Sequence, residues 1–242
     1  MYFEYYLMGI ILLPGILFAS YAQFKVSSTY NKFSQYFIAS NITAGEFVKR
    51  LLDAAGMHNT TVSCGGGHLS DHFNPKTDEI KLSNNVYNSS SVSALGVACH
   101  EFGHALQKKE HYAPYTIRRI LIPITNFTSQ LLWPLVIIGL IFNFGAEPNT
   151  TLGNIFIWSG IIVFGLSVLV NLATLPVEFD ASRRAVKILQ TTGMMTEEEI
   201  DGTKKVLKAA ALTYVAALLV SILNFLRFFL TVILSRNRDW SK

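Results

Sequence analysis

Residues 96–107 read GVACHEFGHALQ and carry the pattern H-E-x-x-H at positions 100–104. Residues four apart lie on one face of an α-helix, so His100 and His104 can offer imidazole nitrogens to one metal ion about 2 Å away. Glu101 lies one residue further round, where it can reach a water on the ion and accept its proton. The pattern predicts a catalytic zinc site in which Glu101 is the general base.

The charges around the motif favour a working site over a chance pair of surface histidines. Glu101 is the only charged residue between Lys81 and Lys108. An unpaired buried carboxylate costs free energy, so a lone glutamate beside two histidines on a half-buried helix needs a reason such as a metal site. Several small residues are expected to let other elements approach this helix, namely Gly96, Ala98, Gly103 and Ala105.

The composition indicates a membrane protein. Half of the 242 residues are hydrophobic and 15% are charged, whereas a soluble domain carries about a quarter charged residues. Crossing a bilayer takes about 20 apolar residues, and four segments are long enough. The predicted transmembrane helices are residues 1–24, 118–146, 153–176 and 209–235. A cleaved signal peptide is the alternative for the first, but Glu4 stands where a basic residue is expected.

Basic residues set the predicted orientation. Lysine and arginine are concentrated between the first and second apolar segments and between the third and fourth. The positive-inside rule therefore places residues 25–117 and 177–208 in the cytoplasm. The basic tail, 236–242, would then lie outside, and Arg227 interrupts the fourth apolar segment, so a re-entrant last segment stays open as an alternative. Two cysteines are compatible with a reducing cytoplasm.

Local signals predict several helices outside the spans. Thr43 and Glu46 form a capping-box pattern before an amphipathic helix, and Gly56 is typical of its end. A serine-rich cap from Ser89 precedes the motif helix. Thr196, followed by three glutamates, predicts the start of another helix.

A β-hairpin is predicted upstream of the motif helix. Residues alternate on either side of NPKTD (74–78), a turn-rich cluster, which predicts strands near 68–73 and 79–82. An extended peptide substrate can pair with an edge strand beside a metal helix. The residues expected to form that edge are Glu79, Ile80, Lys81 and Leu82, although a purely stabilising hairpin is an equal alternative.

A catalytic zinc takes three protein ligands and a water, so the motif leaves one ligand to find. Glu178 is the best choice because it follows a membrane hairpin that begins just after the motif helix and would return the chain to it. The candidates expected on the same side of the membrane are His68, Asp71, His72, His111, Glu178 and Asp180.

The stretches SDHFNPKTDEIKLSNNVYNSSSVSALGVACHEFGHALQ (70–107) and LPVEFDASRRA (175–185) resemble YugP-type neutral zinc metallopeptidases, which are bacterial membrane proteins. The resemblance covers nearly the whole chain. The layout also looks like that of the heat-shock and CAAX-prenyl type membrane zinc peptidases. The resemblance implies an α+β, mainly helical multi-pass membrane protein, with a zincin-like catalytic region, a small β-hairpin and about four transmembrane helices. One catalytic Zn2+ is implied, with His100, His104 and Glu178 as ligands and Glu101 as the general base.

The chain departs from the broader group at one position. An aspartate often stands four residues after the third ligand and supports a metal histidine, whereas here that position is Ser182 and the aspartate is Asp180. A helix would turn Asp180 away from Glu178. The oxyanion formed in peptide cleavage also needs a donor. The candidates for such supporting or oxyanion roles are Asp180, Arg183, His72, His111 and Tyr112.

A second, structural zinc site made of Cys64, His68 and His72 is an alternative use of those residues, but the glycines among them argue against the helix that their spacing would need. Cys99 is expected to be a small core residue.

The sequence thus predicts a membrane-bound zinc endopeptidase of the bacterial cell membrane, with its active site facing the cytoplasm. Its expected partners are a polypeptide substrate, including membrane proteins, and the lipid bilayer. Nucleic acid is not expected, because no basic stripe is interleaved with exposed aromatics. Two alternatives are an intramembrane-cleaving metalloprotease, for which the only Asp-Gly pair is 201–202 in a charged segment, and a non-catalytic zinc-binding membrane scaffold. The oligomeric state is left open.

Overall fold

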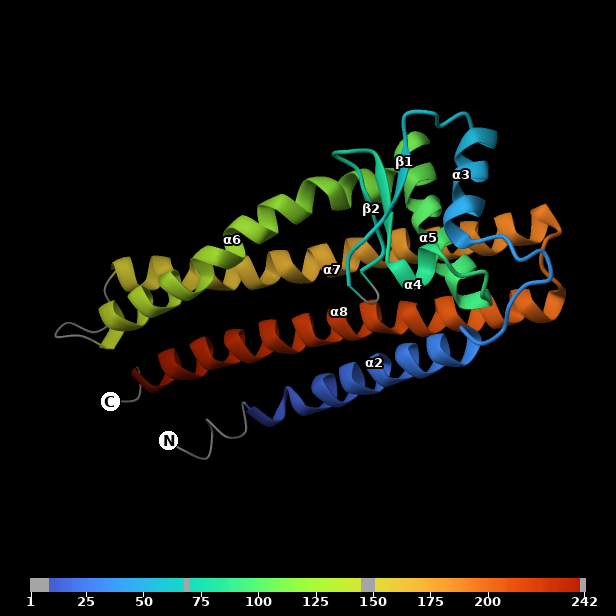
Figure 1. Cartoon of the computed structure of the whole chain (residues 1–242). Helices are drawn as coiled ribbons and strands as arrows, with labels where there is room; N and C mark the ends of the chain where they lie inside the picture. The colour runs from blue at the N-terminus through green and yellow to red at the C-terminus, as the bar shows by residue number, and fades with distance from the viewer. Residues whose placement is uncertain (1–8, 68–69, 145–150, 240–242) are drawn as a thin grey trace. The chain divides into compact units, whose positions relative to one another are not determined.

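The computed structural model describes residues 9–67, 70–144 and 151–239 (Figure 1). Its helices are α2 (Leu13–Phe33), α3 (Ala44–Ala54), α4 (Asn84–Tyr87), α5 (Val92–Lys109), α6 (Ala113–Phe144), α7 (Thr151–Thr192) and α8 (Glu197–Asp239). Its strands are β1 (Thr61–Cys64), β2 (His72–Asn74) and β3 (Glu79–Leu82). The predicted mainly helical α+β class with a small sheet is therefore confirmed.

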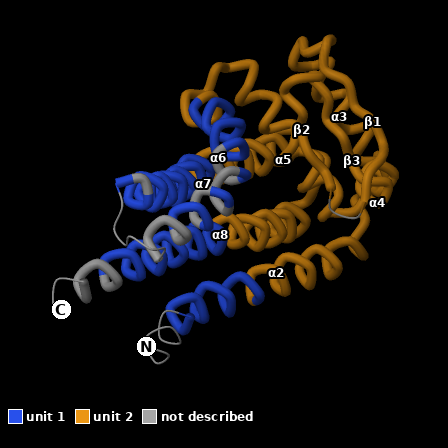
Figure 2. Tube along the Cα trace, turned by 90° about the vertical axis from the view of Figure 1, so that its left-hand side faces the viewer, with its two compact units in different colours: residues 1–20, 117–174, 215–242 blue, residues 21–116, 175–214 orange. Residues whose placement is uncertain are grey.

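Contacts divide the chain into two compact units (Figure 2). One consists of residues 1–20, 117–174 and 215–242, and the other of residues 21–116 and 175–214. Helices α2, α6, α7 and α8 each contribute a stretch to both units. These helices therefore continue from one unit into the other, and the predicted boundaries between spans and cytoplasmic segments stay predictions.

The first unit is built from apolar helices. Within the described residues, two helices are long and apolar enough to cross a membrane by length and composition, 153–192 and 197–233. They are the helices expected for the third and fourth spans. The rings of Phe164 and Phe228 lie 5.0 Å apart and join α7 to α8 in this unit. The other predicted spans, 1–24 and 118–146, extend beyond the described residues and stay predictions.

The second unit has its core around α5. Leu95, Ala98, Cys99, Phe102 and Ala105 on this helix are all buried. They belong to one hydrophobic cluster with side chains of α3, β3 and the last turns of α7, including Phe47, Val48, Ile80, Leu82 and Leu189. Burial raises the pKa of the Cys99 thiol, which keeps it protonated and unreactive. The expectation that Cys99 is a core residue is confirmed.

The predicted helix starts agree with the structure. Thr43 accepts a hydrogen bond from the Glu46 N–H at 3.3 Å, and Gly56 follows the end of α3 with a φ of 64°. Thr196 and Glu199 form a reciprocal capping box, with N–H to side-chain distances of 2.7 and 3.2 Å. These caps satisfy amide groups that have no partner within the helix, which is why their sequence signals are local and readable.

The sheet has the order β1-β3-β2. Strand β2 pairs antiparallel with β3, with His72 opposite Lys81, so the predicted hairpin is present. Strand β1 pairs parallel with β3 on its other side, with Thr61 opposite Glu79. The prediction that Glu79–Leu82 forms a free edge is therefore wrong. The reason is that β1 has only four residues, TVSC, and no clear alternation, so the sequence did not reveal a strand that covers β3.

Candidate metal centre

Three side chains converge inside the second unit. His100 and His104 come from α5 and Glu178 from α7, and their ligand atoms all lie within 4.8 Å of one another. The Oε2 atom of Glu178 is 3.1 Å from His100 Nε2 and 3.6 Å from His104 Nε2. The Glu178 residue is only 1% exposed. Two imidazole nitrogens and a carboxylate around one point fit the three protein ligands of a catalytic zinc.

Gly103 lets the two helices come close enough for this convergence. A Cβ atom at Gly103 would lie 2.9 Å from the main-chain oxygen of Ala181 and 3.2 Å from its Cα. Ala181 is one turn beyond Glu178 on α7, so the backbone of α7 passes over α5 where the two histidines stand. Because Gly103 has no side chain, α5 and α7 can approach closely enough for the Glu178 carboxylate to lie beside the two histidines.

Substituting Gly103 by alanine should weaken zinc binding, by about 10–100-fold as when a ligand loses its support. Alanine favours the helix by about 1 kcal/mol, but the atom it meets is main chain and cannot rotate away. The matched control is Gly165→Ala on α7, where the new Cβ would lie 3.6 Å from Phe225 in ordinary contact. Zinc affinity measured against a chelator checks this, and equal affinity for Gly103→Ala and wild type would contradict it.

Glu101 is held by the sheet. It is 8% exposed, and its Oε2 atom accepts a hydrogen bond of 2.9 Å from the N–H of Phe73 on β2. This bond fixes the plane of the carboxylate and leaves Oε1 free of that donor. A carboxylate oriented beside two histidines that could hold a metal ion can serve as a general base.

The second nitrogen of each histidine also has a partner. His100 Nδ1 lies 3.2 Å from the Ser182 hydroxyl, and His104 Nδ1 lies 2.9 Å from Gln107 Oε1. Ser182 stands four residues after Glu178, at the position where the broader group often has an aspartate, and it supports a histidine there. Asp180 reaches the site through Gln107, whose Nε2 is 2.9 Å from Asp180 Oδ2.

Sequence reasoning missed Gln107. The available signal was its place three residues after His104, on the same helix face. Glutamine is common on helices, so the residue type alone did not indicate a role in the site. The other contacts of Gln107 are made with Val177 and Asp180 on α7, which is distant in sequence.

The charges around His104 raise its pKa. Burial lowers the pKa of this imidazole, but the hydrogen bond to Glu178 and the negative charges of Glu101 and Glu178 outweigh burial. A raised pKa means that the proton is held to higher pH. Because a histidine must be neutral to bind a metal, a zinc ion held here would compete with this proton, and acid would weaken its binding.

The other predicted residues lie outside the cluster of three. Arg183 has a side chain 78% exposed and pairs with Asp180. His72 is exposed on β2, with Nδ1 2.7 Å from the Ser70 oxygen. His111 has a φ of 53° at the end of α5, and Tyr112 lies under the Arg184 guanidinium at 5.8 Å. Their oxyanion roles stay predictions.

The residues named for a second zinc site and for an intramembrane-cleaving protease lie in other environments. Cys64 Sγ lies 3.6 Å from Asn84 Oδ1, and His68, needed for the second zinc site, is outside the described residues. Asp201 lies in the first turns of α8, where its side chain is exposed and 2.6 Å from Lys205 Nζ. An ion-paired, exposed aspartate is a poor ligand for an intramembrane metal site.

Comparisons with known proteins indicate a family of zinc metallopeptidases. A family described as "Putative neutral zinc metallopeptidase" matches residues 8–233. The "Putative membrane protease YugP" of Bacillus subtilis (strain 168) is 40% identical over 220 residues, which cover 90% of this chain and 93% of that protein. Among solved structures, none matches the chain. The chain therefore belongs to the YugP-type family of neutral zinc metallopeptidases.

Proposed function

We propose that the chain is a membrane-bound, zinc-dependent endopeptidase with Glu101 as its general base. The observation that carries the proposal is the convergence of His100, His104 and Glu178 within 4.8 Å, with the Glu101 carboxylate held beside the two histidines. Two histidines and a glutamate, with a second glutamate next to them, are the groups that metal-assisted peptide hydrolysis needs.

The protein's own groups divide the work of hydrolysis. His100, His104 and Glu178 would hold a zinc ion, which when bound would supply Lewis acidity for a peptide carbonyl and for a water whose pKa it would lower to about 7. Glu101, held at Oε2 by the Phe73 N–H, accepts the proton of the attacking water. It then gives a proton to the nitrogen of the leaving amine, so that the base becomes the acid of the second step.

Strand β2 is the substrate-binding edge in this proposal. Within the described residues it pairs with β3 on one side only. The Phe73 N–H donates to Glu101, so it points away from β3 along the unpaired side of β2. An extended peptide that adds to this side would lie next to the general base.

A location in the bacterial cell membrane is supported by the two apolar helices and by the name of the Bacillus subtilis relative, which describes a membrane protease. We place the chain there as a multi-pass protein. The lysine and arginine content of residues 25–117 and 177–208 supports a cytoplasmic active site. Its substrates would be polypeptides, including membrane proteins.

Removal and return of the metal test the proposal. The full chain, purified in detergent, should contain one zinc per molecule and cleave an unfolded polypeptide such as casein. A chelator should abolish cleavage, and stoichiometric zinc should restore it. Cys64→Ser is the matched control, because it removes the exposed thiol outside the site. Cleavage that persists in zinc-free protein, or a zinc-loaded protein that cleaves neither casein nor membrane polypeptides, would overturn the proposal.

A further inference from the structure

A buried glutamine joins one of the site histidines to the helix that carries Glu178. Gln107 is fully buried on α5. Its Oε1 lies 2.9 Å from His104 Nδ1, and its Nε2 lies 2.8 Å from the Val177 oxygen and 2.9 Å from Asp180 Oδ2. Three partners therefore surround one amide, as expected for a buried polar group.

The partners on α7 decide which way the amide faces. The Val177 carbonyl can only accept a hydrogen bond, and so can the ionised carboxylate of Asp180, which pairs with two arginines. Both N–H groups of the Gln107 amide must therefore face α7. The flipped amide would set an oxygen against two oxygens, so it is excluded. Oε1 must face His104.

This orientation has a consequence for the histidine. Because Gln107 Oε1 is an acceptor, His104 Nδ1 must carry a proton, and the lone pair of the neutral ring lies on Nε2. Nε2 is the atom that lies 3.6 Å from Glu178 Oε2. We propose that Gln107 is a positioning residue that holds His104 in the Nδ1–H tautomer and aims its Nε2 at the metal position. This inference rests on the proposed zinc site.

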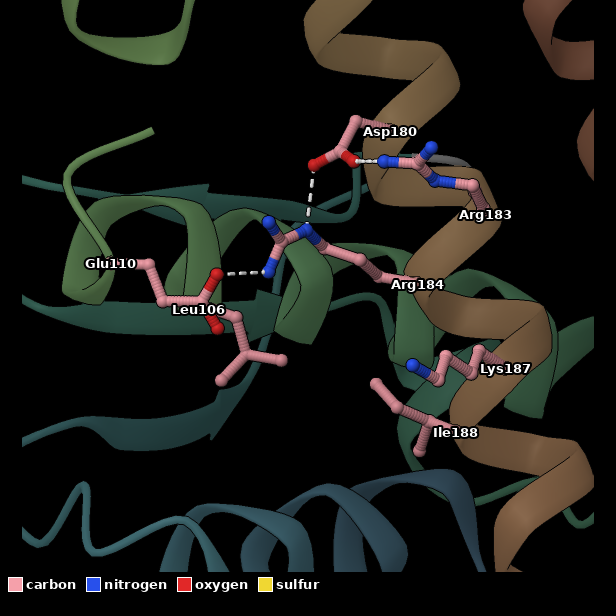
Figure 3. A pocket seen from close by; sticks show the side chains of 7 residues that line it. All are labelled: Leu106, Glu110, Asp180, Arg183, Arg184, Lys187 and Ile188. Carbon is pink, nitrogen blue, oxygen red and sulfur yellow. Dashed lines mark hydrogen bonds and ion pairs between the residues drawn. The ribbon is translucent and has the colours of Figure 1, made fainter. Parts of the chain in front are cut away.

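Ion pairs with neighbouring arginines hold Asp180, one of the two acceptors of the Gln107 amide. Figure 3 shows Asp180 between Arg183 and Arg184, with Arg184 continuing to Glu110. Arg184 Nε is 2.6 Å from Asp180 Oδ2, and Arg184 Nη1 is 2.6 Å from Glu110 Oε2. Glu110 is the residue after α5, so this connection runs from α5 to α7 and back. Asp180, at 4% exposed, thereby keeps one acceptor fixed for Gln107.

His100 offers an internal comparison. Its Nδ1 faces the Ser182 hydroxyl at 3.2 Å, and a hydroxyl can rotate to donate or to accept. Ser182 alone therefore does not decide the tautomer of His100. The two histidines should respond differently when their partners are removed, which makes Ser182→Ala a matched control.

The test measures metal affinity in the full chain carrying Glu101→Gln, so that its result does not depend on cleavage. Gln107→Met keeps the length of the side chain and removes the acceptor and both donors. We expect zinc affinity, measured against a chelator, to fall by about 10–100-fold in Gln107→Met, and by a smaller factor in Ser182→Ala. In zinc-loaded protein with 15N-labelled histidine, the His104 proton should sit on Nδ1, and Gln107→Met should speed its exchange with water.

Each outcome bears on the proposal. Unchanged affinity and unchanged exchange in a folded Gln107→Met protein would overturn it, and so would a His104 proton on Nε2 in the zinc-loaded wild type. If Gln107→Met does not fold, Asp180→Asn replaces it, because a neutral acceptor should weaken zinc binding several-fold in the same direction. Unchanged affinity there would again overturn the inference. A wild-type chain that binds no zinc would overturn the proposed function as well, whereas zinc binding without cleavage would overturn the proposed function alone.

Discussion

Glu101→Gln should lose peptide cleavage while it keeps zinc. Glutamine has the size of glutamate, and its carbonyl oxygen can still accept the Phe73 N–H that now binds Oε2. The ligand atoms of His100, His104 and Glu178 are not touched by the change. What disappears is the basic oxygen, and general-base catalysis is worth about 10²–10⁴-fold in rate. We therefore expect a zinc-loaded protein whose cleavage rate is lower by at least that factor.

The measurement combines zinc content with the initial rate of casein cleavage. Glu46→Gln is the matched control, since Glu46 is an exposed glutamate on α3 whose side chain pairs with Arg50. A Glu101→Gln protein that retains full cleavage would show that another group takes the proton. This result also separates the endopeptidase from the scaffold alternative, because a scaffold would keep its cellular function in this variant.

Features that depend on neighbours in sequence could be predicted. The caps of α3 and α8 and the end of α3 at Gly56 follow from hydrogen bonds within a few residues, so their residue types announce them. The positions of His100, Glu101 and His104 follow from the helical repeat. Glu178 could be proposed from the sequence because the predicted membrane hairpin would return the chain to the motif helix.

The remainder depends on contacts that no local pattern encodes. Strand β1 is short and pairs with β3 residues that lie eighteen positions further along the chain, so no local pattern revealed that β3 is the central strand. The support from Gln107 and Asp180 needs the approach of α7 to α5, which Gly103 permits. Apolar runs located the change in composition near residue 176, and α7 continues through Pro176 to Thr192 as one helix. Hydropathy marks where a helix changes surroundings, and it does not mark where the helix ends.

Glu178→Gln should remove the metal site without damage to the metal-free fold. The two histidine rings lie 4.7 Å apart and alone offer only two nitrogens. A neutral amide is a weak replacement for the third, charged ligand. Because the loss of a supporting hydrogen bond already costs about 10–100-fold in metal affinity, the loss of a ligand should exceed 100-fold.

Glu178→Gln should also change how the stability of the protein responds to zinc. In the metal-free protein Glu178 is a carboxylate 1% exposed that relies on His100 and His104, and burying a charge is unfavourable. Its neutral replacement avoids that cost but loses the interactions with the two histidines that lower the pKa of Glu178, so it should unfold at a similar temperature when zinc is absent. Zinc at 100 times the dissociation constant should stabilise the wild type by about 2.7 kcal/mol, because the ion binds only the folded chain. Glu178→Gln should gain almost nothing at the same concentration.

Thermal unfolding with and without zinc checks both statements in one experiment. Phe179→Ala serves as the matched control, because it changes a half-exposed neighbour on the same turn of α7 and leaves the ligands in place. If Glu178→Gln bound zinc as tightly as wild type and gained the same stability, the third ligand would have to be another residue. A variant already unfolded without zinc would instead show that Glu178 mainly stabilises the fold. Only a site assembled for a metal predicts an undamaged metal-free protein that no longer responds to zinc.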